Sequence, residues 1–142
     1  MSPRHLRFLD TNVLLYSIST AADEARKRDI ATALLDGEDV ALSVQVLQEF
    51  YVQATRRTSE TRVDDAVAEN LVRTWLRFKV QDMTVAVMFD AMTIKARYQL
   101  SYWDAAIVSA ARILGCPEVL TEDLKHGQNI EGVLISNPFR ET

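Results

Sequence analysis

The sequence predicts an α/β protein, a three-layer α/β/α sandwich in which helices cover both faces of a mainly parallel sheet. Short runs rich in Leu, Val and Ile alternate with helical patterns along the chain. Hydrophobic residues make up 48% of the sequence, and only 4 Gly and 3 Pro occur, which excludes a disordered chain. The length of 142 residues fits one domain, so we expect a single domain over 1–142.

The first half of the chain alternates strand-like runs with helical patterns. Runs of Leu, Val and Phe predict strands, and apolar residues three or four positions apart predict helices. The elements expected here are a strand at 6–9, helical turns at 13–18, an amphipathic helix at 22–36, a strand at 40–42 and a helix from 44 to about 57. Asp10 ends the first strand, Gly37 ends the amphipathic helix, and Ser43 is a typical N-cap for the next helix.

The second half continues this alternation. The elements expected are a helix from 64 or 65, a strand at 80–84, helices at 85–98 and 103–114, and strands at 118–121 and 133–135. In the 85–98 helix, Met88, Phe89, Met92 and Ala96 form an apolar stripe that suits the core and an interface equally well. The 103–114 helix is apolar nearly all round, which predicts that it is buried.

Composition and charge exclude several classes of protein. Apolar runs such as 85–89 are far shorter than the roughly 18 residues of a membrane span, and Asp10 and Asn12 interrupt the N-terminal apolar stretch, so we expect a cytoplasmic protein. The single cysteine, Cys116, has no intramolecular disulfide partner and is expected to be a packed small residue. A net charge of −4 argues against a surface built throughout for nucleic acid, but it suits carboxylates gathered around a divalent cation.

Four acidic residues are placed to meet at one edge of the predicted sheet. Asp10 ends the first strand, and Asp123 follows the strand at 118–121. Asp104 opens the buried helix, and Glu49 lies on the helix after the second strand. Because the carboxyl ends of parallel strands share an edge, and ligands bind there, these four side chains are candidates for one site.

Clustered carboxylates repel one another unless a cation neutralises them. Mg²⁺ and Mn²⁺ take oxygen ligands and usually keep several waters. An ion held in this way activates a water and stabilises charge on a phosphate, so that no nucleophilic Ser or Cys is required. The pattern therefore favours metal-dependent hydrolysis of a phosphodiester, with one or two ions.

Each acid also has a purely structural interpretation. Asp104 fits a capping position in the first turn of its helix, and Asp10 fits the N-cap of the helical turns that follow it. Asp123 in isolation fits a solvated turn. Glu49 is harder to explain in structural terms, because valines stand three positions to either side of it on the helix.

Four segments carry these acids in order: Phe8–Leu14, Leu47–Phe50, Trp103–Ile107 and Leu120–Leu124. In order and spacing they resemble the four acidic motifs of PIN-domain ribonucleases, and most closely those of the VapC-type toxins of bacterial toxin–antitoxin pairs. The resemblance spans nearly the whole chain and implies one PIN-like domain.

The resemblance also implies roles for individual residues. Asp10 and Asp104 would be the principal ligands of Mg²⁺ or Mn²⁺, and Glu49 and Asp123 would complete the acidic pocket directly or through water. Small polar residues beside the acids would position them; these are Thr11, Asn12 and Thr121. Because Glu122 precedes Asp123, a shift of one residue would exchange which of the two faces the pocket.

The implied function is that of a divalent-metal-dependent endoribonuclease, the toxin of a VapBC-type pair. Its substrate would be RNA, its partner a small cognate antitoxin, and its assembly a homodimer. A PIN-like module that binds RNA or protein without catalysis stands as the alternative. A haloacid-dehalogenase-like phosphatase would need a second Asp where Asn12 stands, and a dinucleotide-binding fold would need glycines after the first strand.

Two further features concern RNA binding. On a helix that reaches about 57, Arg56 and Arg57 share a face with Glu49, so they are expected either to contact the RNA backbone or to form a solvated surface. Trp103 stands beside the third acid and is placed to stack a base. Tryptophans are more often core residues, however, and that interpretation holds for both Trp103 and Trp75.

Overall fold

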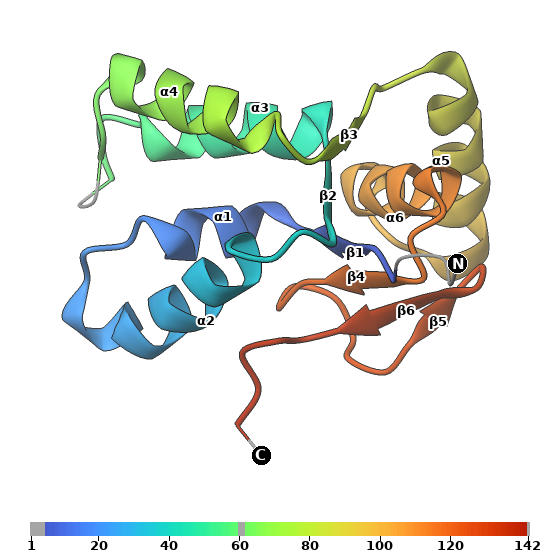
Figure 1. Ribbon diagram of the computed structural model, residues 1–142. Coiled ribbons are helices and arrows are strands. Elements are labelled where there is room, and N and C mark those ends of the chain that lie inside the picture. Colours follow the sequence, from blue (N-terminus) through green and yellow to red (C-terminus); the bar gives the residue numbers. More distant parts are fainter. Residues whose placement is uncertain (1–4, 60–61, 142) are drawn as a thin grey trace.

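A six-stranded sheet forms the middle of the molecule, which is described here by a computed structural model covering residues 5–59 and 62–141 (Figure 1). The strands are β1 (Arg7–Leu9), β2 (Val40–Ser43), β3 (Lys79–Gln81), β4 (Glu118–Leu120), β5 (Asn129–Ile130) and β6 (Val133–Ser136). They lie in the order β3-β2-β1-β4-β6-β5. All neighbours run parallel except β5 and β6, so the mainly parallel sheet is confirmed.

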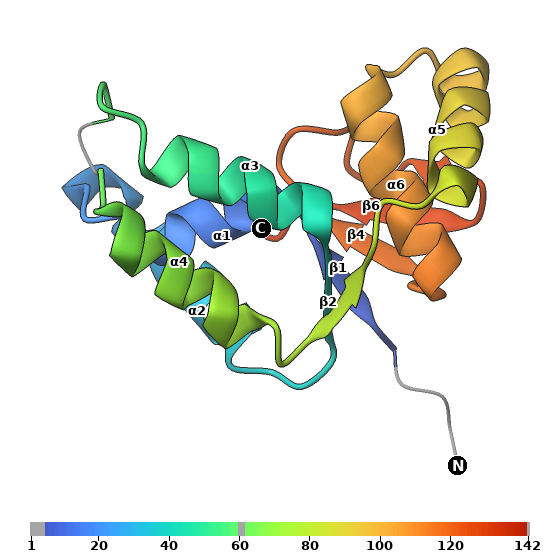
Figure 2. The ribbon, with the colours of Figure 1, turned by 90° about the horizontal axis from the view of Figure 1, so that it is seen from above.

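Helices cover the sheet on both faces. They are α1 (Thr11–Ser17), a short 3₁₀ helix η1 (Ala22–Glu24), α2 (Ala25–Leu35), α3 (Val44–Ala54), α4 (Asp65–Trp75), α5 (Val85–Tyr98) and α6 (Tyr102–Leu114). Figure 2 shows α1 to α4 on one side of the strands and α5 and α6 on the other, which confirms the three-layer sandwich. In the described part of the chain, no helix combines the length and the hydrophobicity needed to cross a membrane.

The core lies between the sheet and the two helical layers. β2 is buried along its whole length, and the middle of α6 is buried from Ala105 to Ala111, as its apolar sequence predicts. Phe50 of α3 meets Trp75 of α4 edge to face, with ring centroids 4.7 Å apart. Cys116 is buried as expected. Strands covered on both faces need continuous apolar runs, which is why the short strands were readable from the sequence.

Side-chain caps fix the starts of the helices that carry the acids. Asp10 Oδ1 accepts from the next backbone N–H at 2.7 Å, Ser43 Oγ accepts from that of Val46 at 3.3 Å, and Ser101 Oγ accepts from that of Asp104 at 3.1 Å. Each cap of this kind stabilises a helix by about 1 kcal/mol. The N-cap interpretation of Asp10 is therefore confirmed, and the start of α6 places Asp104 in its first turn.

The end of α3 differs from the prediction. The helix ends at Ala54: the backbone N–H of Arg56 donates to the Gln53 carbonyl, three residues back and not four, and the Ala54 carbonyl accepts from the backbone N–H of Val63 at 3.0 Å. Arg56 and Arg57 lie beyond the helix. The prediction that they share a helical face with Glu49 was therefore wrong.

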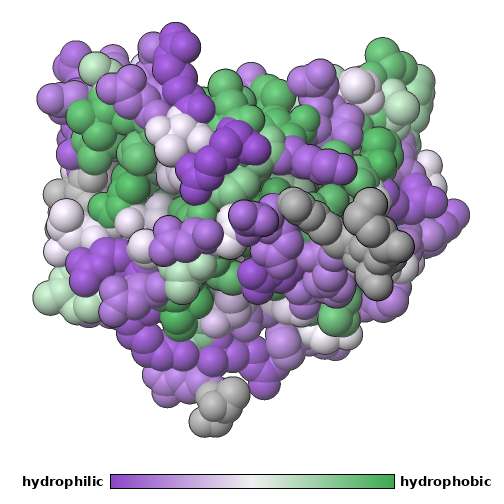
Figure 3. All heavy atoms as spheres, viewed as in Figure 1, coloured by the Kyte–Doolittle hydropathy of each residue, from purple (hydrophilic) through white to green (hydrophobic). Residues whose placement is uncertain are grey.

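The apolar stripe of α5 lies on the surface. Val87, Ala91 and Ile94 are the buried residues of this helix, whereas Phe89 and Met92 are 60% and 46% exposed. In Figure 3, hydrophobic side chains interrupt the polar surface over α5 and over α3 and α4. The sequence left open whether this stripe packs in the core or forms an interface. Phe89 and Met92 do not belong to the core.

β5 was not expected from the sequence. Its two residues pair with β6 through a turn at Glu131 and Gly132, whose φ angles are 50° and 89°. Turns with two positive φ angles match the twist of a hairpin. A strand of two residues carries too little pattern to be recognised by periodicity.

Candidate functional site

The candidate site lies where the chain reverses direction across the sheet. From β1 the chain moves to β2 and β3 on one side, and it returns through β4 to the other side of β1. The carboxyl ends of β1 and β4 therefore border the crevice in which such sheets bind ligands. The backbone N–H of Asp10 donates to the Leu120 carbonyl at 3.0 Å, which joins the two strand ends.

The four predicted acids, Asp10, Glu49, Asp104 and Asp123, are called the acid group below. Asp10 is its buried member, with 4% of its surface exposed. Its Oδ1 accepts from the backbone N–H of Thr11, and its Oδ2 accepts from the Thr121 hydroxyl at 2.8 Å. The pKa of Asp10 is raised from 3.8 to about 6: burial raises it most, the two hydrogen bonds lower it in part, and the charges of Asp123 and Glu49 add to the rise. The hydrogen bonds thus hold the carboxyl group in place, but they do not neutralise its negative charge.

A hydrogen-bond network holds Asp123 beside this group. Asn12 Nδ2 donates to Asp123 Oδ2 at 3.0 Å and to Thr121 Oγ1 at 3.2 Å, and the backbone N–H of Asp123 donates to the same Thr121 oxygen at 3.0 Å. Thr121 therefore connects Asp10, Asn12 and Asp123. The Oδ1 atom of Asn12 is buried and has no hydrogen-bond partner in the described residues.

The neighbouring acid, Glu122, points to a different set of partners. Its carboxylate accepts from Lys27 Nζ at 2.9 Å and from the Tyr16 hydroxyl. The structure therefore places Asp123, and not Glu122, at the acid group. Sequence reasoning had left these two positions open, because the partner of Glu122 lies far away in the chain.

Glu49 and Asp104 come from the helical layers on opposite faces of the sheet. Glu49 Oε2 accepts from the Thr11 hydroxyl at 2.9 Å, and Glu49 Oε1 accepts from Gln45 Nε2 at 2.8 Å. Burial raises the pKa of Asp104, the hydrogen bond with Ser101 lowers it, and the charges of Asp123 and Glu49 raise it. The charges of Asp123 and Glu49 thus act on both Asp10 and Asp104.

The donor set suits a hard divalent cation, although the carboxylates do not form a closed cage. Among residues 5–59 and 62–141, no three acidic, histidine or cysteine side chains are arranged to hold a metal ion directly. Mg²⁺ commonly binds through one or two carboxylates and keeps its remaining ligands as water. Burial and the charges of Asp123 and Glu49 disfavour ionisation of Asp10 and Asp104, and a bound cation would offset both effects. The residues present therefore fit such an ion.

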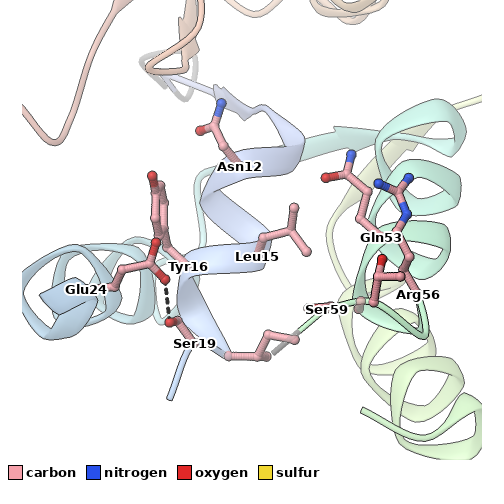
Figure 4. A pocket seen from close by; sticks show the side chains of 11 residues that line it. Asn12, Leu15, Tyr16, Ser19, Glu24, Gln53, Arg56 and Ser59 are labelled. Carbon is pink, nitrogen blue, oxygen red and sulfur yellow. Dashed lines mark hydrogen bonds between the residues drawn. The ribbon is translucent and has the colours of Figure 1, made fainter. Parts of the chain in front are cut away.

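A hollow of about 460 Å³ adjoins the site between α1, η1 and the end of α3. Figure 4 shows Asn12 at one end, Leu15 between the walls, and Gln53 and Arg56 on the side of α3. Arg56 also lines a smaller hollow with Glu49. Although Arg56 lies past the end of α3, it is thus placed beside the acid group, whereas Arg57 is exposed in the turn that follows.

Gln45 is a site residue that the sequence reasoning missed. It stands one helical turn before Glu49, and its Nε2 donates both to Glu49 and to the Trp103 carbonyl at 3.1 Å. The i,i+4 spacing of an amide and a carboxylate on one helix was the available signal. Trp103 is 64% exposed, so the core interpretation is wrong for Trp103 and right for Trp75, which is 4% exposed.

Comparison with known proteins identifies the family. A sequence model of the PIN domain matches residues 7–129. No curated protein sequence matches the chain significantly. Among solved structures, a toxin–antitoxin complex from Klebsiella pneumoniae gives a TM-score of 0.69 at 20% identity and covers 95% of this chain and 99% of that one.

Two further structures have the same fold. FitAcB from Neisseria gonorrhoeae gives a TM-score of 0.69 at 18% identity over 96% of this chain and 100% of that one. VapC20 from Mycobacterium tuberculosis, a sarcin–ricin loop cleaving toxin, gives 0.62 at 23% identity over 80% of this chain and 86% of that one. The family match covers most of the chain and the fold agrees with it, so the chain belongs to the PIN domain family.

Proposed function

We propose that this protein is a divalent-metal-dependent endoribonuclease that hydrolyses RNA phosphodiester bonds, and that it is the toxin of a VapBC-type pair. The observation that carries the proposal is the buried carboxyl group of Asp10, whose pKa is raised to about 6 by burial and by the charges of Asp123 and Glu49. A buried carboxylate surrounded by like charges destabilises a fold unless a ligand of opposite charge binds there. Membership of the PIN family and similarity to toxin structures support the same function.

In this proposal Asp10 and Asp104 hold Mg²⁺ or Mn²⁺, and Glu49 and Asp123 complete the site directly or through water. A bound ion of this kind lowers the pKa of a water and stabilises charge on a phosphodiester. The proposal takes residues 1–142 as one PIN-like domain.

The remaining polar residues orient the acids. Thr121 donates to Asp10, Thr11 donates to Glu49, and Asn12 donates to Asp123. Each hydroxyl or amide thereby removes rotational freedom from a carboxylate before the substrate arrives, which is the usual contribution of residues that surround metal ligands. Arg56, at the edge of the neighbouring hollow, is placed to contact the RNA backbone.

The toxin role implies protein partners. The structures similar to this chain include complexes of toxin with antitoxin, and we propose a small cognate antitoxin and a homodimeric assembly for this protein. An apolar hollow of about 510 Å³ between α3 and α4, lined by Leu47, Tyr51, Val52, Val72 and Leu76, offers a surface for a protein partner.

Cleavage of a pool of structured RNAs by purified protein tests the function. Cleavage is expected with Mg²⁺ or Mn²⁺ and is expected to be lost with EDTA and in Asp104→Asn. Asp82→Asn, an exposed acid outside the site, is the matched control and should cleave normally. Metal-independent cleavage, or full activity of Asp104→Asn, would contradict the proposal. If the protein binds RNA and no ion in calorimetry, the non-catalytic module becomes the better description.

A further inference from the structure

Trp103 is a large aromatic side chain left exposed beside the acid group. It precedes Asp104, and 64% of its surface is open to solvent. Its carbonyl accepts from Gln45 Nε2, and the same nitrogen donates to Glu49. One amide group therefore ties the backbone of Trp103 to a carboxylate of the candidate site.

The indole lies at the edge of a hollow of about 300 Å³. Its lining residues come from the N-terminal parts of α3, α5 and α6 and from the segment that leads from β3 to α5. The rings of Tyr102 and Trp103, the side chains of Met83, Val85 and Met88, and the amide of Gln45 form most of its wall. All eight described residues that line it are uncharged.

The indole is supported by its neighbour in the chain. The rings of Tyr102 and Trp103 meet edge to face, with centroids 4.9 Å apart and an angle of 88° between their planes. An aromatic ring supported at its edge keeps a face available to a flat partner. The apolar side chains of Met83 and Met88 adapt readily to such a partner.

Gln45 supplies a polar group of defined orientation. Both partners of its Nε2 atom, a carboxylate and a carbonyl, only accept hydrogen bonds, so the nitrogen must face them. Gln45 is 5% exposed, and its Oε1 has no hydrogen-bond partner in the described residues. A buried acceptor without a partner gains from a ligand that brings an N–H donor.

We propose that this hollow holds an unpaired nucleobase of the RNA, next to the phosphodiester that the acid group cleaves. The base stacks on Trp103 and offers an N–H donor to Gln45. This proposal rests on the proposed function. Its chemical basis is the division between the two neighbouring regions: an uncharged aromatic hollow suits a base, whereas the acid group beside it suits a phosphate only through a cation.

The two tryptophans of the chain make the binding step measurable. Trp75 is buried against Phe50, so Trp75→Phe leaves Trp103 as the reporter of the hollow. Short single-stranded RNAs of one base type each, added with Ca²⁺ in place of Mg²⁺ or Mn²⁺ so that a cation still lies between the acid group and the phosphate, should quench Trp103 fluorescence. Fluorescence anisotropy of the labelled RNAs measures affinity independently of the tryptophan signal.

Variants separate stacking from hydrogen bonding. Trp103→Ala should weaken binding at least about tenfold, and Trp103→Phe should restore much of it, because every base stacks on an aromatic face. Gln45→Met should reduce the difference between bases more than the average affinity. Phe89→Ala removes an equally exposed aromatic ring of α5 outside the hollow and should bind RNA normally.

Several results would overturn the base-binding role. These are RNA binding without a change in Trp103 fluorescence, unchanged affinity of Trp103→Ala, and failure of all four RNAs to bind. A fluorescence shift with protein concentration alone, together with a doubled mass in light scattering, would assign the hollow to a second copy of the chain and would also overturn it. If the protein cleaves RNA and Trp103→Ala keeps the same KM and base preference, the nuclease stands and the hollow does not. If RNA quenches Trp103 fluorescence but no metal-dependent cleavage occurs, the base-binding role of the hollow stands and the nuclease function does not.

Discussion

Replacement of Asp10 by Asn should stabilise the metal-free protein, because it removes a charge that the fold buries. The pKa of Asp10 rises from 3.8 to about 6, mainly through burial. At about 1.4 kcal/mol per pKa unit, the ionised group destabilises the folded state by about 3 kcal/mol at pH 7. The folded state keeps the proton to higher pH than the unfolded chain, so stability falls between about pH 4 and pH 6 and stays reduced above that range.

The hydrogen bonds of Asp10 reduce the expected gain. An Asn side chain keeps an oxygen for the backbone N–H of Thr11, but its NH₂ would face the hydroxyl of Thr121. Thr121 Oγ1 already accepts from Asn12 and from the backbone of Asp123, so the new donor has no lone pair to bind. The lost bond costs about 1 kcal/mol, which leaves a net stabilisation of about 2 kcal/mol at pH 7.

Urea unfolding in EDTA measures this difference. The gain of Asp10→Asn over the natural protein should be present at pH 7 and nearly absent at pH 4, where Asp10 is protonated in the folded state. Asp82→Asn, at an exposed position, should stay within about 0.5 kcal/mol of the natural protein at both pH values. Addition of Mn²⁺ should stabilise the natural protein and not the variant. A variant that is less stable than the natural protein at pH 7, or equally stabilised at pH 4, would refute the reasoning.

Three further predictions concern other parts of the molecule. Asp123→Asn should abolish metal-dependent RNA cleavage, whereas Glu122→Gln, which loses contacts with Lys27 and Tyr16 only, should retain it; equal cleavage by the two variants would contradict the position of Asp123. Trp75→Ala should lower the free energy of unfolding in urea by about 3–5 kcal/mol, since it leaves a cavity beside Phe50, and a loss below about 1 kcal/mol would argue against that packing. Burial raises the pKa of the Cys116 thiol to about 11, so a thiol reagent at pH 8 should label it only after unfolding, and rapid labelling of the folded protein would contradict its burial.

The edge of the sheet that carries the acids was predictable, because it depends on local patterns. Asp10 follows a short apolar run, and Asp104 opens a helix that begins with a Ser cap. Glu122 and Asp123 could not be separated by local reasoning. The choice between them depends on Lys27, which lies 95 positions away and captures Glu122.

The buried side of α5 was not predictable either. Apolar residues occur on several sides of this helix, so periodicity does not select one. The structure turns Ala91 inward and Phe89 outward, and Asp90 accepts from Ser109 and Arg112 of α6. These contacts between helices determine the orientation of α5, and they are absent from the pattern of α5 alone.

The hydrogen bonds of Thr121 bear on how the protein is synthesised. This residue joins Asp10 and Asn12 across 111 and 109 positions of the chain. A chain emerges from the ribosome N-terminus first. Asp10 and Asn12 therefore cannot form their hydrogen bonds with Thr121 until the chain has been made through β4 and Thr121. A product of premature termination before β4 lacks Thr121 and Asp123, and so cannot assemble the acid group. Such incomplete products are therefore expected to lack the proposed RNA-cleaving activity.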